Sequence, residues 1–136
     1  MKTGYQIQSD FLALFNDTEL PKAIQGNVYR EGMRPRDSAS EDMVVIFTTA
    51  DADQFQQGVV TVNVFVPFIY PYDNGVAVEN GARCAEIEEI AQRSVETLTA
   101  VKSNYRIRLH NAIHTLQDES ISQSFVVIAL DFTHKD

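Results

Sequence analysis

A strict alternation of valine with other residues, from position 60 to 66, constrains the fold more than any other part of this sequence. A β-strand places successive side chains on opposite faces, so residues 57–66 would form a strand with one valine face and one mixed face. Such a strand needs a partner strand and a layer that covers its valines. Residues 43–49 are also rich in β-branched side chains, and the polar turn at residues 51–54 predicts a hairpin. The valine face comprises Val60, Val62, Val64 and Val66.

The last quarter of the chain predicts a second hairpin. Residues 104–116 form one expected strand, residues 117–120 the turn, and residues 121–133 the returning strand. A short strand is also expected at residues 27–30, directly after Gly26. In the returning strand, large apolar residues would share the core face: Val126, Ile128, Leu130 and Phe132.

Two other segments have the period of an amphipathic helix. The first, about residues 5–16, is followed by Pro21, which is expected to close this helical region. The second covers about residues 81–101. Because helices and hairpins are segregated along the chain, we predict an α+β fold, a mostly antiparallel sheet of four to five strands with two helices packed on one face. The two apolar stripes are Ile7, Phe11, Leu14 and Phe15, and Cys84, Ile87, Ile90, Ala91, Ser94, Leu98 and Val101.

Composition and charge limit the possible functions. The chain has 136 residues, 44% of them hydrophobic, which predicts a single domain over residues 1–136. Its formal net charge of −8 argues against stable nucleic-acid binding and against attachment to anionic membrane surfaces. A single cysteine, Cys84, favours a reducing compartment. No apolar run has the length of a signal peptide or a membrane span, so we expect no membrane association.

The sequence lacks the motifs of common catalytic sites, such as a Gly-rich phosphate loop, a nucleophile elbow or a dinucleotide-binding fingerprint. His110 and His114 are four residues apart, but in an expected strand that spacing is about 13 Å, too wide for one zinc ion. Cys84 lies on an apolar helix stripe, which favours a buried structural role. We therefore expect no enzyme activity, no metal and no cofactor. The acidic residues of the second helix are interpreted as a solvated face: Glu86, Glu88 and Glu89.

Two loops are candidates for contact with another molecule. Arg30, Arg34 and Arg36, at and within loop 31–42, are three of the eleven basic residues of an acidic chain. These side chains would either pair with neighbouring carboxylates or reach another subunit or partner. Residues 67–80 hold large apolar side chains, which are either tucked over the sheet edge or offered to a partner. The candidate interface residues are Arg34, Arg36, Phe68, Tyr70 and Tyr72. The carboxylates available for local pairing are Glu31, Asp37, Glu41 and Asp42.

Several stretches, together with the order of elements, resemble the small tail-completion proteins of phages and prophages. These proteins form the tail terminator or head-to-tail joining group, and the similarity is greatest to forms carried by prophages of Bacteroides-type bacteria. It covers the chain from the first helix to the last strand and includes no catalytic motif. Where the family has an acidic residue after Pro67, this chain has Phe68. The stretches are residues 26–29 (GNVY), 33–38 (MRPRDS), 41–45 (EDMVV) and 58–67 (GVVTVNVFVP).

The resemblance implies a structural role in virion assembly, within the cytoplasm of the bacterial host. Members assemble as rings, commonly hexamers, that cap the tail tube and present a surface to the head connector. The partners would be copies of the chain itself, the tail tube and head-connector proteins, with loops 31–42 and 67–73 reaching them. DNA would pass through an acidic lumen without stable binding. The residues alone leave two alternatives open, a small non-catalytic α+β module that binds a ligand or protein, and an enzyme that uses carboxylates of the second helix.

Overall fold

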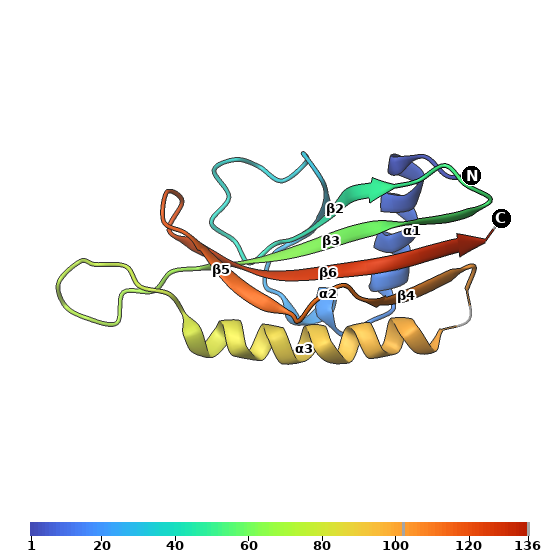
Figure 1. Cartoon of the computed structure of the whole chain (residues 1–136). Coiled ribbons are helices and arrows are strands. Elements are labelled where there is room, and N and C mark those ends of the chain that lie inside the picture. The colour runs from blue at the N-terminus through green and yellow to red at the C-terminus, as the bar shows by residue number, and fades with distance from the viewer. Residues whose placement is uncertain (102, 136) are drawn as a thin grey trace.

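The structure, a computed structural model, describes residues 1–101 and 103–135 (Figure 1). Within these residues it contains one mixed sheet of six strands and three helices. The elements in chain order are α1 (Gly4–Asn16), α2 (Leu20–Ala23), β1 (Val28–Arg30), β2 (Met43–Ala50), β3 (Phe55–Pro67), α3 (Gly81–Ala100), β4 (Tyr105–Leu109), β5 (His114–Asp118) and β6 (Gln123–Lys135).

Two 13-residue strands form the centre of the sheet. β3 and β6 are antiparallel and paired along their whole length, from Phe55 opposite Lys135 to Pro67 opposite Gln123. β2 pairs with the free side of β3, and the short β1 lies parallel to β2 at that edge. β4 and β5 both pair with the other side of β6, β4 near its C-terminal end and β5 near its N-terminal end. The sheet is therefore mostly antiparallel, as predicted.

The helices and one face of the sheet enclose the hydrophobic core. The alternating valines of β3 are fully buried there, at 0–1% exposure, and the apolar stripes of α1 and α3 pack against them, except that Val101 lies after the end of α3 and is 46% exposed. Figure 1 shows α3 running along the long strands and α1 crossing behind them. The ring of Phe11 from α1 contacts Tyr105 and Phe132 edge to face, with centroids 5.3 and 5.6 Å apart. The predicted α+β fold is confirmed, and burial of these apolar stripes is the physical reason for it.

The structure corrects the number of strands from four or five to six. The expected single strand over residues 104–116 is two strands, β4 and β5, separated at residues 110–113. In the sequence, His110, Ala112 and His114 continue the every-second-residue pattern of the preceding strand, so the pattern does not reveal the break between β4 and β5. The last strand also starts and ends two residues later than expected.

A third helix, the single turn α2, was not predicted. Pro21 lies in the first turn of α2, where the missing N–H of proline costs no hydrogen bond, so it starts a helical turn after α1 has ended at Asn16. The N–H of Leu20 donates to the hydroxyl of Ser94 on α3 at 3.1 Å, and Leu20 is fully buried. Tertiary contact with α3 therefore stabilises a turn that is too short to form alone.

Among the described residues, helices cover only the valine face, and the opposite face of the sheet is largely open. Side chains on this open face of β3, such as Thr61 and Phe65, are half-buried by their neighbours within the sheet. Loop 31–42 covers one end of it, where the guanidinium carbon of Arg34 lies 3.9 Å from the centroid of the Phe65 ring. The other end of the open face, near the start of β3, has no such cover in the described part of the chain.

Candidate interaction surfaces

A hairpin arm formed by residues 68–80 projects from one end of the sheet and connects β3 to α3 (Figure 1). Its base is held by the backbone. The N–H of Phe68 donates to the carbonyl of Ser122 at 2.9 Å, and Ile69 and Val78 exchange hydrogen bonds of 2.8 and 2.9 Å. The tip of the arm lies beyond the end of the sheet, so the arm is fixed at its base and exposed at its tip.

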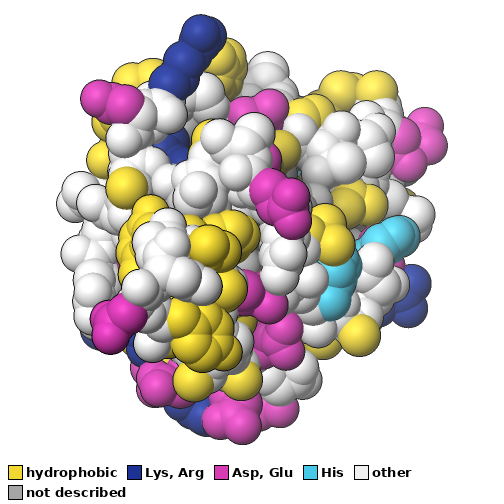
Figure 2. Space-filling model, turned by 90° about the vertical axis from the view of Figure 1, so that its left-hand side faces the viewer, with side chains coloured by type: hydrophobic (Ala, Val, Ile, Leu, Met, Phe, Trp, Pro, Cys, Tyr) yellow, Lys and Arg dark blue, Asp and Glu magenta, His cyan; other side chains and the backbone are white. Residues whose placement is uncertain are grey.

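Large apolar side chains are exposed along this arm. Tyr70 is 66% exposed, Tyr72 63% and Val76 53%. Of the candidate residues, the two tyrosines therefore point into solvent, whereas Phe68 is half-buried at the base. Figure 2 views the molecule from this end and shows apolar side chains gathered on it, with carboxylates among them. The arm itself has two acidic residues and no basic one.

Arg34 lies inside a polar network at the same end of the sheet. Its Nε is 3.0 Å from Oδ2 of Asp42, and its Nη2 donates to Oε1 of Gln123 on β6 at 2.8 Å. Asp42 is fully buried and also accepts hydrogen bonds from the hydroxyl of Ser38 (2.6 Å) and the N–H of Asn27 (2.9 Å). Arg34 therefore pairs with a carboxylate of its own loop, which is the first of the two alternatives given above. This side chain anchors loop 31–42 to the sheet.

A second network joins this region to the start of α3. Arg83 donates from Nε and Nη2 to the two carboxylate oxygens of Glu41, at 2.9 and 2.6 Å, and from Nη2 to the carbonyl of Ala23 at 2.7 Å. Glu41 is only 6% exposed. The chain passes so close to both networks at Gly26 that a Cβ there would lie 2.2 Å from Oδ1 of Asp42, which only a glycine avoids. The base of the arm thus adjoins a tightly bonded frame.

Asp42 is expected to make the stability of the fold depend on acid pH. Burial disfavours its charged form, but hydrogen bonds from Ser38, Asn27 and Arg34 outweigh burial, so the pKa of Asp42 lies below its ordinary value of 3.8. A pKa lowered by folding stabilises the fold above about pH 4, and this stabilisation is lost as the pH falls through the folded-state pKa. In urea unfolding from about pH 5 to 2, the Asp42→Asn variant should therefore depend less on pH than the wild type. If the unfolding free energies of the variant and the wild type fell in parallel with pH, other carboxyl groups would be responsible for the pH dependence.

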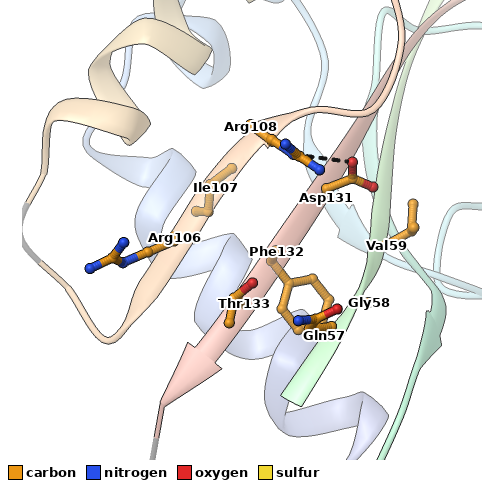
Figure 3. A pocket seen from close by; sticks show the side chains of 9 residues that line it. All are labelled: Gln57, Gly58, Val59, Arg106, Ile107, Arg108, Asp131, Phe132 and Thr133. Carbon is orange, nitrogen blue, oxygen red and sulfur yellow. Dashed lines mark ion pairs between the residues drawn. The ribbon is translucent and has the colours of Figure 1, made fainter. Parts of the chain in front are cut away.

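The open face of the sheet has a hollow near the start of β3, at the opposite end of this strand from the arm (Figure 3). The hollow has a volume of about 690 Å³. Arg106 and Arg108 line it from β4, and because they are two residues apart they lie on one face of the strand. Arg108 is 3.5 Å from Asp131 and its side chain is 83% exposed, while Arg106 extends away from Asp131 (Figure 3). The other lining residues are Gln57, Gly58, Val59, Ile107, Phe132 and Thr133.

The remaining arginine and histidine candidates lie apart from one another. Arg36 is exposed on loop 31–42. His110 lies after β4, with Nδ1 2.8 Å from Oδ1 of Asp131. His114 begins β5, and its Nδ1 is 2.9 Å from the carbonyl oxygen of Ala112. The two histidines therefore have separate local partners on either side of the break between β4 and β5.

Cys84 is buried on α3, within the core. Burial, followed by the nearby charge of Glu79, raises the pKa of the Cys84 thiol to about 11, so little thiolate forms near neutral pH. Across residues 1–101 and 103–135, no three His, Cys, Asp or Glu side chains are grouped closely enough to hold a metal ion. None of the helices in these residues is long and apolar enough to cross a membrane.

Sequence reasoning missed the hollow and the pair between Arg83 and Glu41. The alternation of Arg106 and Arg108 is visible in the sequence, but only the pairing of β3, β6 and β4 brings Gly58 beside them. Comparison of the sequence with models of protein families and with curated proteins finds no match. The features of this chain that bear on function are the exposed arm and the hollow, together with the resemblance in the sequence.

Proposed function

We propose that this chain is a non-enzymatic assembly protein of a phage or prophage virion. In this proposal it self-associates into a hexameric ring at the end of the tail tube and joins the tube to the head connector. Assembly takes place in the cytoplasm of the bacterial host, and the ring remains in the virion. The observation that carries self-association is the arm at residues 68–80, with its fixed base and exposed apolar tip. The resemblance to tail-completion proteins supplies the biological setting.

An exposed aromatic arm is unfavourable on a monomer and favourable at an interface. Tyr70 and Tyr72 each expose more than 60% of their surface, and tyrosine is enriched among the residues that dominate binding energy at interfaces. Contiguous exposed apolar surface commonly marks an interaction site. Because hydrogen bonds already fix the base of the arm, less conformational entropy is lost when the tip docks. These properties support a role in protein association.

The hollow on the open sheet face favours a second candidate, a small binding module. Its volume of about 690 Å³ is within the range of ligand sites, although such sites are mostly apolar and this one is lined by several polar side chains. A ligand would raise the melting temperature of the chain by mass action, whereas self-association makes the melting temperature depend on protein concentration. Thermal unfolding at several protein concentrations, with and without candidate ligands, distinguishes the two functions.

Replacing Tyr70 and Tyr72 together with aspartate is expected to abolish self-association and to leave the fold intact. Both side chains lie in solvent in the monomer, and the new charges would have to be desolvated at an interface. Light scattering from micromolar to near-millimolar concentration measures the molar mass, and negative-stain images of the most concentrated sample show its shape. Tyr5→Asp is a matched control because Tyr5 is 70% exposed near the N-terminal end of α1, away from the arm (Figure 1).

A closed six-fold ring of the wild type, with the Tyr5→Asp variant forming the same ring, would support the proposal. A wild-type chain that stays monomeric throughout this range would contradict self-association of the free chain. A Tyr70/Tyr72 variant that associates normally would remove the arm from the interface. Arg34→Glu is unsuitable for this test because the substitution would place a second carboxylate beside buried Asp42 and disturb the fold.

A further inference from the structure

The arm and the hollow lie at opposite ends of the same strand. The arm leaves β3 at Pro67, and the hollow contains Gln57 and Gly58 near the other end. At about 3.3 Å per residue, these two ends are roughly 30 Å apart. The part of the arm beyond the backbone pair of Ile69 and Val78 runs out and back, so it reaches no further than about 15 Å. The arm therefore cannot occupy the hollow of its own chain.

The two surfaces are complementary in charge. The part of the arm beyond the backbone pair of Ile69 and Val78 contains Asp73 and no basic residue, whereas Arg106 and Arg108 line the hollow. Glu79 lies at the base of the arm, where it accepts a hydrogen bond from the hydroxyl of Ser124 at 2.8 Å. Among the described residues, Arg106 has no ion-pair partner, and Arg108 has only the long pair with Asp131 at 3.5 Å. Because each chain carries a formal charge of −8, two copies repel unless an acidic surface of one faces a basic surface of the other. The arm and the hollow satisfy this requirement.

The side chains are also complementary in kind. Tyrosine rings stack favourably against guanidinium groups, and the arm exposes two tyrosines where the hollow presents two arginines. The exposed basic residue at the arm end, Arg36, lies on loop 31–42, which Arg34 ties down beside the arm. The hollow, by contrast, is a basic surface remote from the arm.

We propose that the hollow between β3, β6 and β4 receives the arm tip of a second copy of this chain, with Tyr70 and Tyr72 against the guanidinium groups of Arg106 and Arg108. This inference rests on the proposed self-association and names the two surfaces that meet. The contact is heterologous, because each copy offers its arm to one neighbour and its hollow to another. Contacts of this kind propagate from copy to copy and form a ring when the rotation between neighbours closes, as the proposed function requires.

A mixing experiment tests the inference. One variant carries Tyr70→Asp and Tyr72→Asp and keeps an intact hollow, and the other carries Arg106→Glu and Arg108→Glu and keeps an intact arm. Each variant alone is expected to be monomeric by light scattering. An equimolar mixture is expected to form one-to-one pairs of twice the monomer mass and nothing larger, because a pair contains one intact arm and one intact hollow. Near-ultraviolet circular dichroism checks that both variants are folded.

A matched control separates the position of the charges from their number. Lys22→Glu with Arg93→Glu changes the net charge by the same amount at exposed positions away from the hollow, and this variant is expected to associate as the wild type does. If the wild type associates and the Arg106/Arg108 variant does too, the hollow is not the receptor and self-association still stands. If both variants are monomeric and the mixture stays monomeric, the arm does not enter the hollow. A monomeric wild type would instead contradict self-association of the free chain, on which this inference rests.

Discussion

The Asp42→Ala variant is expected to lose about 3–5 kcal/mol of unfolding free energy, the cost of breaking a buried ion pair by removing one partner. Asp42 has no exposed surface, and its carboxylate accepts hydrogen bonds from Arg34, Ser38 and Asn27 at 2.6–3.0 Å. Without it, the Arg34 side chain, which is 12% exposed, keeps its charge in a site that water barely reaches. The N–H of Asn27 also loses its acceptor, and a donor left without a partner costs further free energy because it has been removed from water.

Urea unfolding at neutral pH, followed by circular dichroism, measures this loss as a lower midpoint at an unchanged slope. Asp37→Ala is the matched control, since Asp37 is exposed on the same loop, and a change within about 0.5 kcal/mol is expected for it. Equal effects of the two substitutions would show that the network around Asp42 does not stabilise the fold. A large effect confined to Asp42 would establish that loop 31–42 is anchored through its buried carboxylate.

The parts of this fold that were predictable from sequence are those set by local periodicity. The valines of β3 alternate at period two because one face of the strand meets the helices, and all four are buried. The helix boundaries, 4–16 and 81–100, agree closely with the predicted ranges because apolar stripes at period 3.6 mark them. The first hairpin was equally clear, since a polar turn separates two β-branched segments. In each case the spacing of apolar residues within one segment shows which face of that segment is buried.

Contacts between distant segments left no comparable signal. Arg34 and Gln123 are 89 positions apart, and Arg83 and Glu41 are 42 apart, so no spacing rule pairs them. The break between β4 and β5 was hidden because residues 110–114 keep a strand-like alternation. Exposure of the tyrosines on the arm was one of two alternatives in the sequence, and the position of the arm beyond the sheet decides between them. Tertiary geometry was needed in each case.

The two networks and the arm share one end of the molecule. The network of Asp42 ties loop 31–42 to the N-terminal end of β6, and Arg83 ties the first turn of α3 to Glu41. The arm runs from the end of β3 into that same first turn of α3. One attachment point, the first turn of α3, is therefore held by the ion pair between Arg83 and Glu41, and the other, the end of β3, pairs with the start of β6, to which Arg34 is bonded. This rigid frame would present the exposed tyrosines in a fixed direction.

The importance of this frame can be measured with two arginines on one helix. Arg83 and Arg93 both lie on α3, and each donates two hydrogen bonds to one glutamate, Glu41 and Glu19 respectively. The side chains of the first pair are 20% and 6% exposed, and those of the second are 53% and 50% exposed. Arg83 also donates to the carbonyl of Ala23 and pairs with the exposed Glu86 at 2.9 Å. Water screens the exposed pair and barely reaches the buried one, so the buried pair should contribute more to the free energy of unfolding.

Arg83→Met is expected to cost about 3 kcal/mol of unfolding free energy, because it leaves the Glu41 charge buried without its partner. Arg93→Met keeps the same helix propensity and should change the urea midpoint little, since its partner is already solvated. Adding Glu41→Gln to the Arg83→Met variant removes the stranded charge and should recover part of the loss. Equal effects of the two arginine substitutions would exclude the buried pair as a specific anchor, and a Glu41→Gln substitution that deepens the loss would exclude charge burial as its cause.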